Sequence, residues 1–126
     1  MIKRETLKTE QQNKNSLEID QFAISKILET INKEDQKIAF AVNEVLSDVE
    51  EVVSYAKSSL SSGGRVFYVG AGTSGRLGVL DASECPPTYS VAKDWFIGVI
   101  AGGDRALQES IEGAEDDKAQ AKIDLL

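Results

Sequence analysis

A glycine-rich loop between a short apolar run and a predicted helix constrains this chain more than any other feature. Residues 66–69, Val-Phe-Tyr-Val, are β-branched or aromatic and stop at a glycine, which predicts a buried parallel strand ending in a tight turn. The loop glycines leave out Cβ atoms that would keep a ligand off the backbone, and two hydroxyl side chains stand where the next helix exposes unpaired N–H groups. These loop residues are Gly70, Gly72, Thr73, Ser74 and Gly75. They predict a binding site for an anion.

The spacing of the three glycines also satisfies the fingerprint of dinucleotide-binding folds. Such folds need a full helix after the loop and an acidic residue about 20 residues further on. Here Asp81 and the pair Pro86 and Pro87 predict a helix that ends near Leu80, and the first acid after the next apolar run is Asp104. Both observations favour a phosphate monoester over a dinucleotide.

Charge and composition limit the remaining chemistry. The net charge of −7 opposes binding to nucleic acid or to an anionic membrane, because both need clustered Lys and Arg. The chain has no histidine, which excludes imidazole bases, Ser-His-Asp triads and most zinc sites within it, so we expect no metal. The single cysteine, Cys85, reads as a small buried residue. With no disulfide and no apolar leader segment, we expect a cytoplasmic location.

Two helices are predicted before the glycine loop. Apolar residues recur at three- and four-residue steps from Leu17 to Ile31, which is typical of a helix with one buried face. Asn32 is placed to cap a second helix, whose apolar stripe continues to Leu60 before Gly64 closes the segment. We interpret the stripe as a packing face, against the sheet or against the same helix of a second subunit.

The predicted fold class is α/β. Residues 96–100 form a second apolar run, Trp95 lies at its edge, and a turn with two glycines follows, which indicates strands and helices in alternation around a parallel sheet. We divide the chain into a flexible segment 1–16, N-terminal helices 17–62 and a partial phosphosugar-binding domain 63–126. Two strands bury little, so we expect the first half of a doubly wound sheet, in a fragment or a truncated gene product.

Residues 70–89, together with 101–103 and 112–116, closely resemble the N-acetylmuramic acid 6-phosphate etherases of the sugar-isomerase (SIS) superfamily. The resemblance runs from about residue 17 to the C-terminus. It implies a cytoplasmic homodimer that cleaves a D-lactyl ether in amino sugar catabolism and cell-wall recycling, with an amino sugar 6-phosphate as substrate and no cofactor. It also implies that Gly72, Thr73, Ser74 and Gly75 bind the substrate.

The same resemblance implies two catalytic carboxylates, Glu84 and Glu115. From the residues alone, a catalytic role for Glu84 is no better supported than a structural one, in which its carboxylate braces a loop made rigid by two prolines. Glu115 stands among acids that are common at a helix N-terminus. Two carboxylates suit the etherase reaction, because one can remove the C2 proton and the other can protonate the departing lactyl oxygen.

Two other functions remain open. Glucokinase regulatory proteins share much of this pattern, so the chain is alternatively a phosphosugar sensor without catalysis. A third possibility is that the chain is an inert structural half-domain.

Overall fold

The computed structural model describes residues 11–125. They divide into two compact units after Val49, and each unit is considered by itself. Of the segment predicted to be flexible, residues 1–10 lie outside the described part of the chain.

The first unit is dominated by one long helix, α1, Ile24–Asn43, preceded by the short 3-10 helix η3, Ile19–Gln21. The predicted restart at Asn32 is wrong. Its side chain accepts a hydrogen bond from Gln36 Nε2 at 2.8 Å, so it stabilises the helix interior by an i,i+4 contact instead of capping a new helix. The helix breaks later, where the N–H of Val45 donates to the carbonyl of Val42 at 3.1 Å.

Glu34 ties the segment before α1 to the helix itself. Its two carboxylate oxygens accept hydrogen bonds from the side-chain amides of Asn13 and Asn15, each at 2.8 Å, and Lys37 Nζ lies 2.6 Å away. The hydrogen bond from Lys37, followed by those from the two amides, lowers the pKa of Glu34 to about 2. The contact therefore persists well into acid solution.

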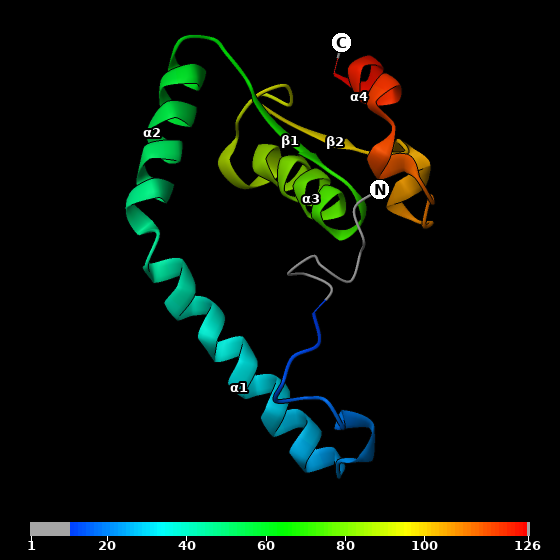
Figure 1. Cartoon of the computed structure of the whole chain (residues 1–126). Helices are drawn as coiled ribbons and strands as arrows, with labels where there is room; N and C mark the ends of the chain where they lie inside the picture. The colour runs from blue at the N-terminus through cyan, green and yellow to red at the C-terminus, as the bar shows by residue number, and fades with distance from the viewer. Residues whose placement is uncertain (1–10, 126) are drawn as a thin grey trace. The chain divides into compact units, whose positions relative to one another are not determined.

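The second unit is built on two parallel strands, as predicted. After α2, Leu46–Ser61, strand β1 covers Val66–Gly70 and pairs in parallel with β2, Phe96–Ile100. The register places Val66 opposite Phe96 and Gly70 opposite Ile100, so both strands end at the same edge (Figure 1). Loops that leave this edge can therefore converge on one site.

The helix after the glycine loop is longer than the sequence predicted. Helix α3 covers Gly72–Tyr89 and continues through Pro86 and Pro87, so the predicted end near Leu80 is wrong. Both prolines lie in the last turns, where a fixed φ near −65° fits a helix and only a few backbone hydrogen bonds are lost. Helix length thus gives no argument against a dinucleotide. The one remaining argument is that the first acid after the next apolar run, Asp104, comes too late in the sequence. It also means that Glu84 lies within a helix and is not held by a proline-braced loop.

Glycines let α3 approach the strands closely. A Cβ atom on Gly98 would lie 2.5 Å from Val79 Cα, and one on Gly75 would lie 2.7 Å from both the carbonyl oxygen of Gly70 and Ile100 Cγ1. The prediction that Gly70 and Gly75 make room for a ligand therefore needs correction, since they make room for each other. Gly72 is different, because it has open space around it and a φ of +54°.

The remaining elements follow β2. The chain passes through two 3-10 helices, η4, Asp104–Leu107, and η5, Ala114–Asp116, to α4, Lys118–Asp124. Asp117 caps α4, accepting from the N–H groups of Ala119 and Gln120. A helix that opens at Glu112, which the acids of residues 112–117 favour by sequence, does not form, because α4 begins only at Lys118.

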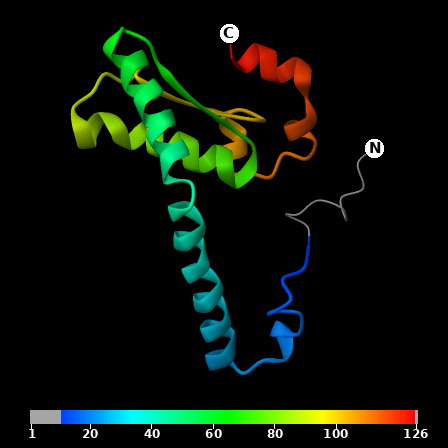
Figure 2. The ribbon, with the colours of Figure 1, turned by 60° about the vertical axis from the view of Figure 1, so that its left-hand side comes forward.

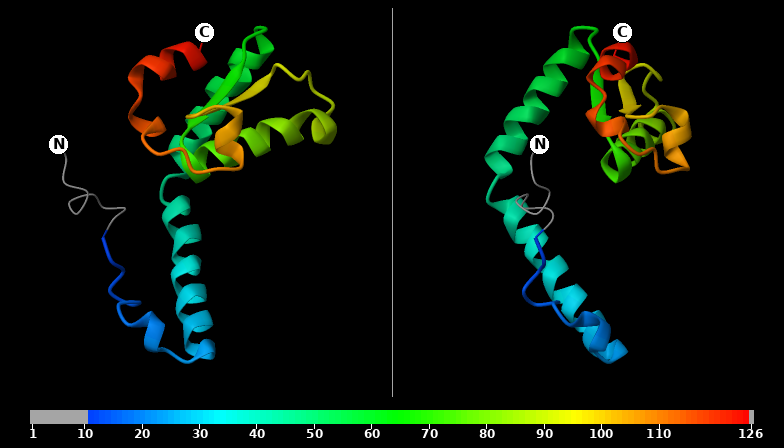
Figure 3. Two further views of the ribbon diagram at one scale, coloured as in Figure 1. Left: turned by 90° about the vertical axis from the view of Figure 1, so that its right-hand side faces the viewer. Right: turned by 45° about the vertical axis from the view of Figure 1, so that its right-hand side comes forward.

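The strands are covered unevenly. Helix α3 runs along them on one face (Figure 2), and α4 lies on the opposite side (Figure 3). On that opposite face Phe67 is 41% exposed and Val69 is 61% exposed, so α4 covers only part of it and the strand that the sequence predicted as buried is partly open.

The apolar stripe of α2 is also exposed. Val52 and Val53 are open to solvent, and with Leu60 they line one wall of an apolar groove whose other wall includes Trp95 and Phe96. Among residues 11–125, no helix has both the length and the apolar character needed to cross a membrane.

Candidate phosphosugar site

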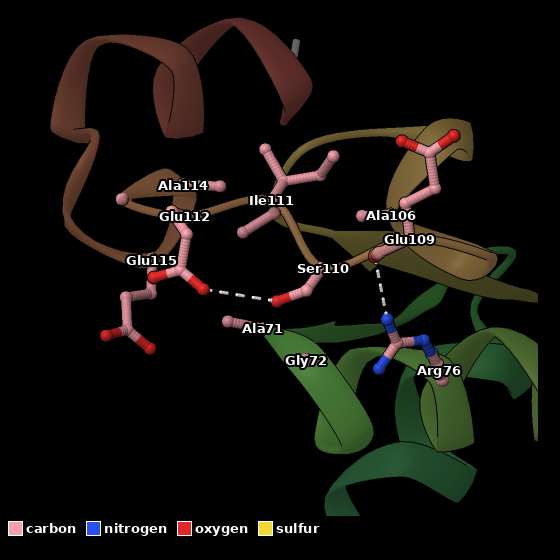
Figure 4. A pocket seen from close by; sticks show the side chains of 12 residues that line it. Ala71, Gly72, Arg76, Ala106, Glu109, Ser110, Ile111, Glu112, Ala114 and Glu115 are labelled. Atoms are coloured by element: carbon pink, nitrogen blue, oxygen red, sulfur yellow. Dashed lines mark hydrogen bonds between the residues drawn. The ribbon is translucent and has the colours of Figure 1, made fainter.

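A small cavity lies at the edge where the two strands end (Figure 4). Its volume is about 170 Å³. Three segments line it: the start of α3, the turn after β2, and the loop between η4 and η5. The lining residues that carry polar side chains are Arg76, Glu109, Ser110, Glu112 and Glu115.

The start of α3 presents free N–H groups beside this cavity. Ala71 is the N-cap residue and its side chain makes no capping bond. Within the described residues, the backbone N–H groups of Gly72, Thr73 and Ser74 have no backbone acceptor, whereas that of Gly75 donates to the carbonyl of Ala71 at 3.3 Å. Three exposed donors at the positive end of an 18-residue helix favour a bound anion.

Acidic side chains come from the loop that faces this helix start. Glu112 accepts a hydrogen bond from Ser110 Oγ at 3.4 Å, while the carboxylate of Glu109 points away from the cavity (Figure 4). Glu115 follows on η5 and also lines the cavity. The arrangement places donors for an anion on one side and carboxylates able to accept a proton on the other.

Arg76 joins the two sides. Its Nε donates to the carbonyl of Leu107 at 3.1 Å and its Nη2 donates to the carbonyl of Glu109 at 2.9 Å. From the sequence alone, Arg76 is equally a residue that helps to bind an anion or a surface residue, whereas the structure shows it bonding a second segment of the chain. Sequence reasoning did not identify Ser110 as a site residue. The only sequence signal was its position two residues before Glu112, the acid that it bonds.

The predicted site residues do not all meet. Gly72 and Glu115 line the same cavity, and Thr73 and Ser74 are exposed on the first turn of α3. Gly75 is buried against the strands. Glu84 is exposed twelve positions after Gly72 on the same helix, which corresponds to about 18 Å along its axis. Within one chain, Glu84 therefore lies far from this cavity.

A second cluster, made of Tyr68 of β1 with Asp81 and Cys85 of α3, lies away from the cavity. The hydroxyl of Tyr68 bonds the carboxylate of Asp81, and this bond, with burial, raises the pKa of Tyr68 to about 12. Cys85 is buried, as predicted, and burial with the nearby Asp81 charge raises the pKa of its thiol. The cluster stabilises the contact between α3 and β1.

Comparison with known proteins places the chain in a family. The model described as the glucokinase regulatory protein N-terminal SIS domain matches residues 44–126. The chain belongs to this family of SIS domains. The predicted fold class, an α/β unit with the first strands of an SIS sheet, is thereby confirmed.

Curated relatives share one name. A protein called N-acetylmuramic acid 6-phosphate etherase from Actinobacillus succinogenes is 52% identical over 93% of this chain. One of the same name from Lactococcus lactis is 49% identical over the whole of this chain. A Bacillus licheniformis protein called N-acetylmuramic acid 6-phosphate etherase 1 is 52% identical over 95% of the chain. The predicted resemblance is confirmed. The chain spans about two-fifths of the length of these relatives, from 38% to 42%.

Proposed function

We propose that this chain supplies the first part of the site of a carbon–oxygen lyase that cleaves the D-lactyl ether of N-acetylmuramic acid 6-phosphate. The products are N-acetylglucosamine 6-phosphate and D-lactate. One observation carries the proposal: Gly72, whose N–H has no backbone acceptor among the described residues, and the carboxylate-bearing residue Glu115 line the same cavity. The names of the relatives, at about half identity, support the choice of substrate.

The proposed binding mode follows from charge. The 6-phosphate lies against the N–H groups of Gly72, Thr73 and Ser74, with the hydroxyls of Thr73 and Ser74 as further donors. The buried Gly75 keeps the helix start close to the strand end. The acidic loop then faces the sugar and not the phosphate, since the carboxylates of Glu112 and Glu115 would repel a phosphate placed beside them.

The proposed reaction uses two carboxylates. Opening of the sugar ring gives a C1 aldehyde that acidifies the C2 proton, which Glu115 removes as the base. Glu84 then donates a proton to the lactyl oxygen leaving C3, and water adds to the unsaturated product. The role of Glu84 rests on the family resemblance, because its helical, exposed position does not by itself favour a proton donor.

We propose a homodimer for the same reason. Glu84 and the cavity are separated by about 18 Å of helix within one chain, so a second copy that brings its own Glu84 to the cavity resolves the geometry. The exposed stripe of α2 offers an apolar face for such contact. We also propose a cytoplasmic location, where sugar phosphates are metabolised.

Sedimentation tests this assembly. We expect the mass of the chain in analytical ultracentrifugation to rise with concentration and to approach twice the monomer. Replacing Val52 and Val53 by Ser should shift the equilibrium to monomer, while Glu50→Gln, in the same helix, should not. A wild-type chain that remains monomeric at all concentrations would reject the homodimer.

A second function is supported by the family match. The matching description names a regulatory protein, which favours a phosphosugar sensor that binds without turnover. We expect the chain alone to show little or no turnover, so the two functions are separated in a longer protein that contains it. With N-acetylmuramic acid 6-phosphate, the etherase releases lactate and the sensor returns the ligand unchanged.

Ser74 provides the test of the phosphate site. We expect Ser74→Ala to weaken binding of N-acetylglucosamine 6-phosphate about tenfold in calorimetry, since one hydrogen bond to a charged group is lost. Ser83→Ala is the matched control, because Ser83 lies on the same helix and its hydroxyl bonds the carbonyl of Leu80. Equal affinity of wild type and Ser74→Ala would count against the site.

A further inference from the structure

Arg76 links the acidic loop to the helix of the anion site by hydrogen bonds from its side chain. It extends from the second turn of α3 and donates to two carbonyls, those of Leu107 and Glu109, at 3.1 and 2.9 Å. These partners lie 31 and 33 positions away in the sequence. Figure 4 shows the guanidinium aimed at the loop from beneath.

The other hydrogen bonds of the loop are local. Among the described residues, every other hydrogen bond made by residues 104–114 reaches no more than four positions along the chain. The apolar side of the loop is held by packing, since Ala106 is buried and a Cβ on Gly102 would touch the side chain of Ile111. The polar side, which leads to Glu115, receives the two hydrogen bonds from Arg76.

We propose that Arg76 is a positioning residue that sets the acidic loop, and Glu115 with it, against the start of α3. The effect on Glu115 rests on the proposed function, whereas the hydrogen bonds from Arg76 to the loop do not. A guanidinium suits the task, because its planar fork offers donors in fixed directions and keeps its charge at any working pH. Lysine keeps the charge but loses the fork.

The first experiment measures the loop alone. In hydrogen exchange with mass spectrometry, we expect the amides of residues 107–115 to exchange about tenfold faster in Arg76→Lys, the effect of losing about 1.4 kcal/mol. Exchange in β1 and β2 should not change. Arg105→Lys is the matched control, since Arg105 Nε bonds the Glu109 side chain only locally, at 2.8 Å. Exchange as in wild type for Arg76→Lys would overturn the proposal.

Chemical rescue of an Arg76 variant distinguishes loss of these hydrogen bonds from a general loss of stability. In Arg76→Ala, millimolar methylguanidinium should restore slow exchange in residues 107–115, and methylammonium at the same concentration should not. If neither compound restores it, or both do, the two-point fastening is wrong.

The second experiment separates positioning from direct contact. Arg76→Lys should leave the Kd for inorganic phosphate within about twofold of wild type, yet weaken N-acetylglucosamine 6-phosphate about tenfold, because only the sugar reaches the loop. Equal weakening of both ligands would show that Arg76 binds phosphate directly and would overturn the positioning role. A wild-type chain that binds neither ligand would reject the proposed function, and the exchange experiment would still decide the fastening.

Discussion

Gly98→Ala is expected to lower the free energy of unfolding by about 3 kcal/mol, the upper end of what overpacking a core costs. The added methyl group would stand 2.5 Å from Val79 Cα, a backbone atom of α3 that cannot move without shifting the helix. Urea denaturation followed by circular dichroism measures the change. The same shift should disturb the start of α3, which packs on the strands through Gly75.

Gly63→Ala is the control for this prediction. Gly63 has a φ of +77° and nothing within 4 Å of an added Cβ, so alanine there meets only the strain of the left-handed region. That strain costs about 1 kcal/mol. If Gly98→Ala is no more destabilising than Gly63→Ala, then α3 does not approach β2 as closely as described.

Replacing the two carboxylates should divide the proposed reaction into its steps. In a preparation that contains this chain and releases lactate from N-acetylmuramic acid 6-phosphate, Glu115→Gln should lower both C2 proton exchange with solvent and lactate release by a factor of about 10² to 10⁴. Glu84→Gln should lower lactate release similarly but keep the exchange, because removal of the C2 proton needs no acid. Deuterium incorporation seen by NMR, together with a lactate assay, measures both.

Glu109→Gln is the matched control, because Glu109 borders the same cavity with its carboxylate turned away (Figure 4). It should retain both activities. The reverse pattern, with exchange kept in the Glu115 variant and lost in the Glu84 variant, would exchange the roles of the two residues.

Local sequence patterns predicted the parts of the fold that local chemistry decides. Residues 96–100 were predicted as a strand and are one, and the β-branched run from Val66 was predicted within one residue of its end at Gly70. The start of α3 in the glycine loop followed from the same reasoning, since a loop without Cβ atoms before a helical pattern has few alternatives.

Tertiary contacts decided what the sequence missed. Pro86 and Pro87 stop an isolated helix, yet α3 continues through them while its inner face packs on the strands. Gly75 read as space for a ligand until its contact with Gly70 was known. Arg76 could not be assigned, because its two acceptors lie more than 30 residues away and are backbone atoms that carry no sequence pattern.

The position of Cys85 gives the chain an internal reporter of its own opening. It is the single cysteine, it is buried on the inner face of α3, and its raised thiol pKa leaves little of the reactive thiolate at neutral pH. A thiol reagent in solution can therefore modify the chain rapidly only in molecules where α3 has separated from β1. The rate of labelling at Cys85 therefore reports how readily α3 opens, and it can be followed by the mass of the chain without a mutation.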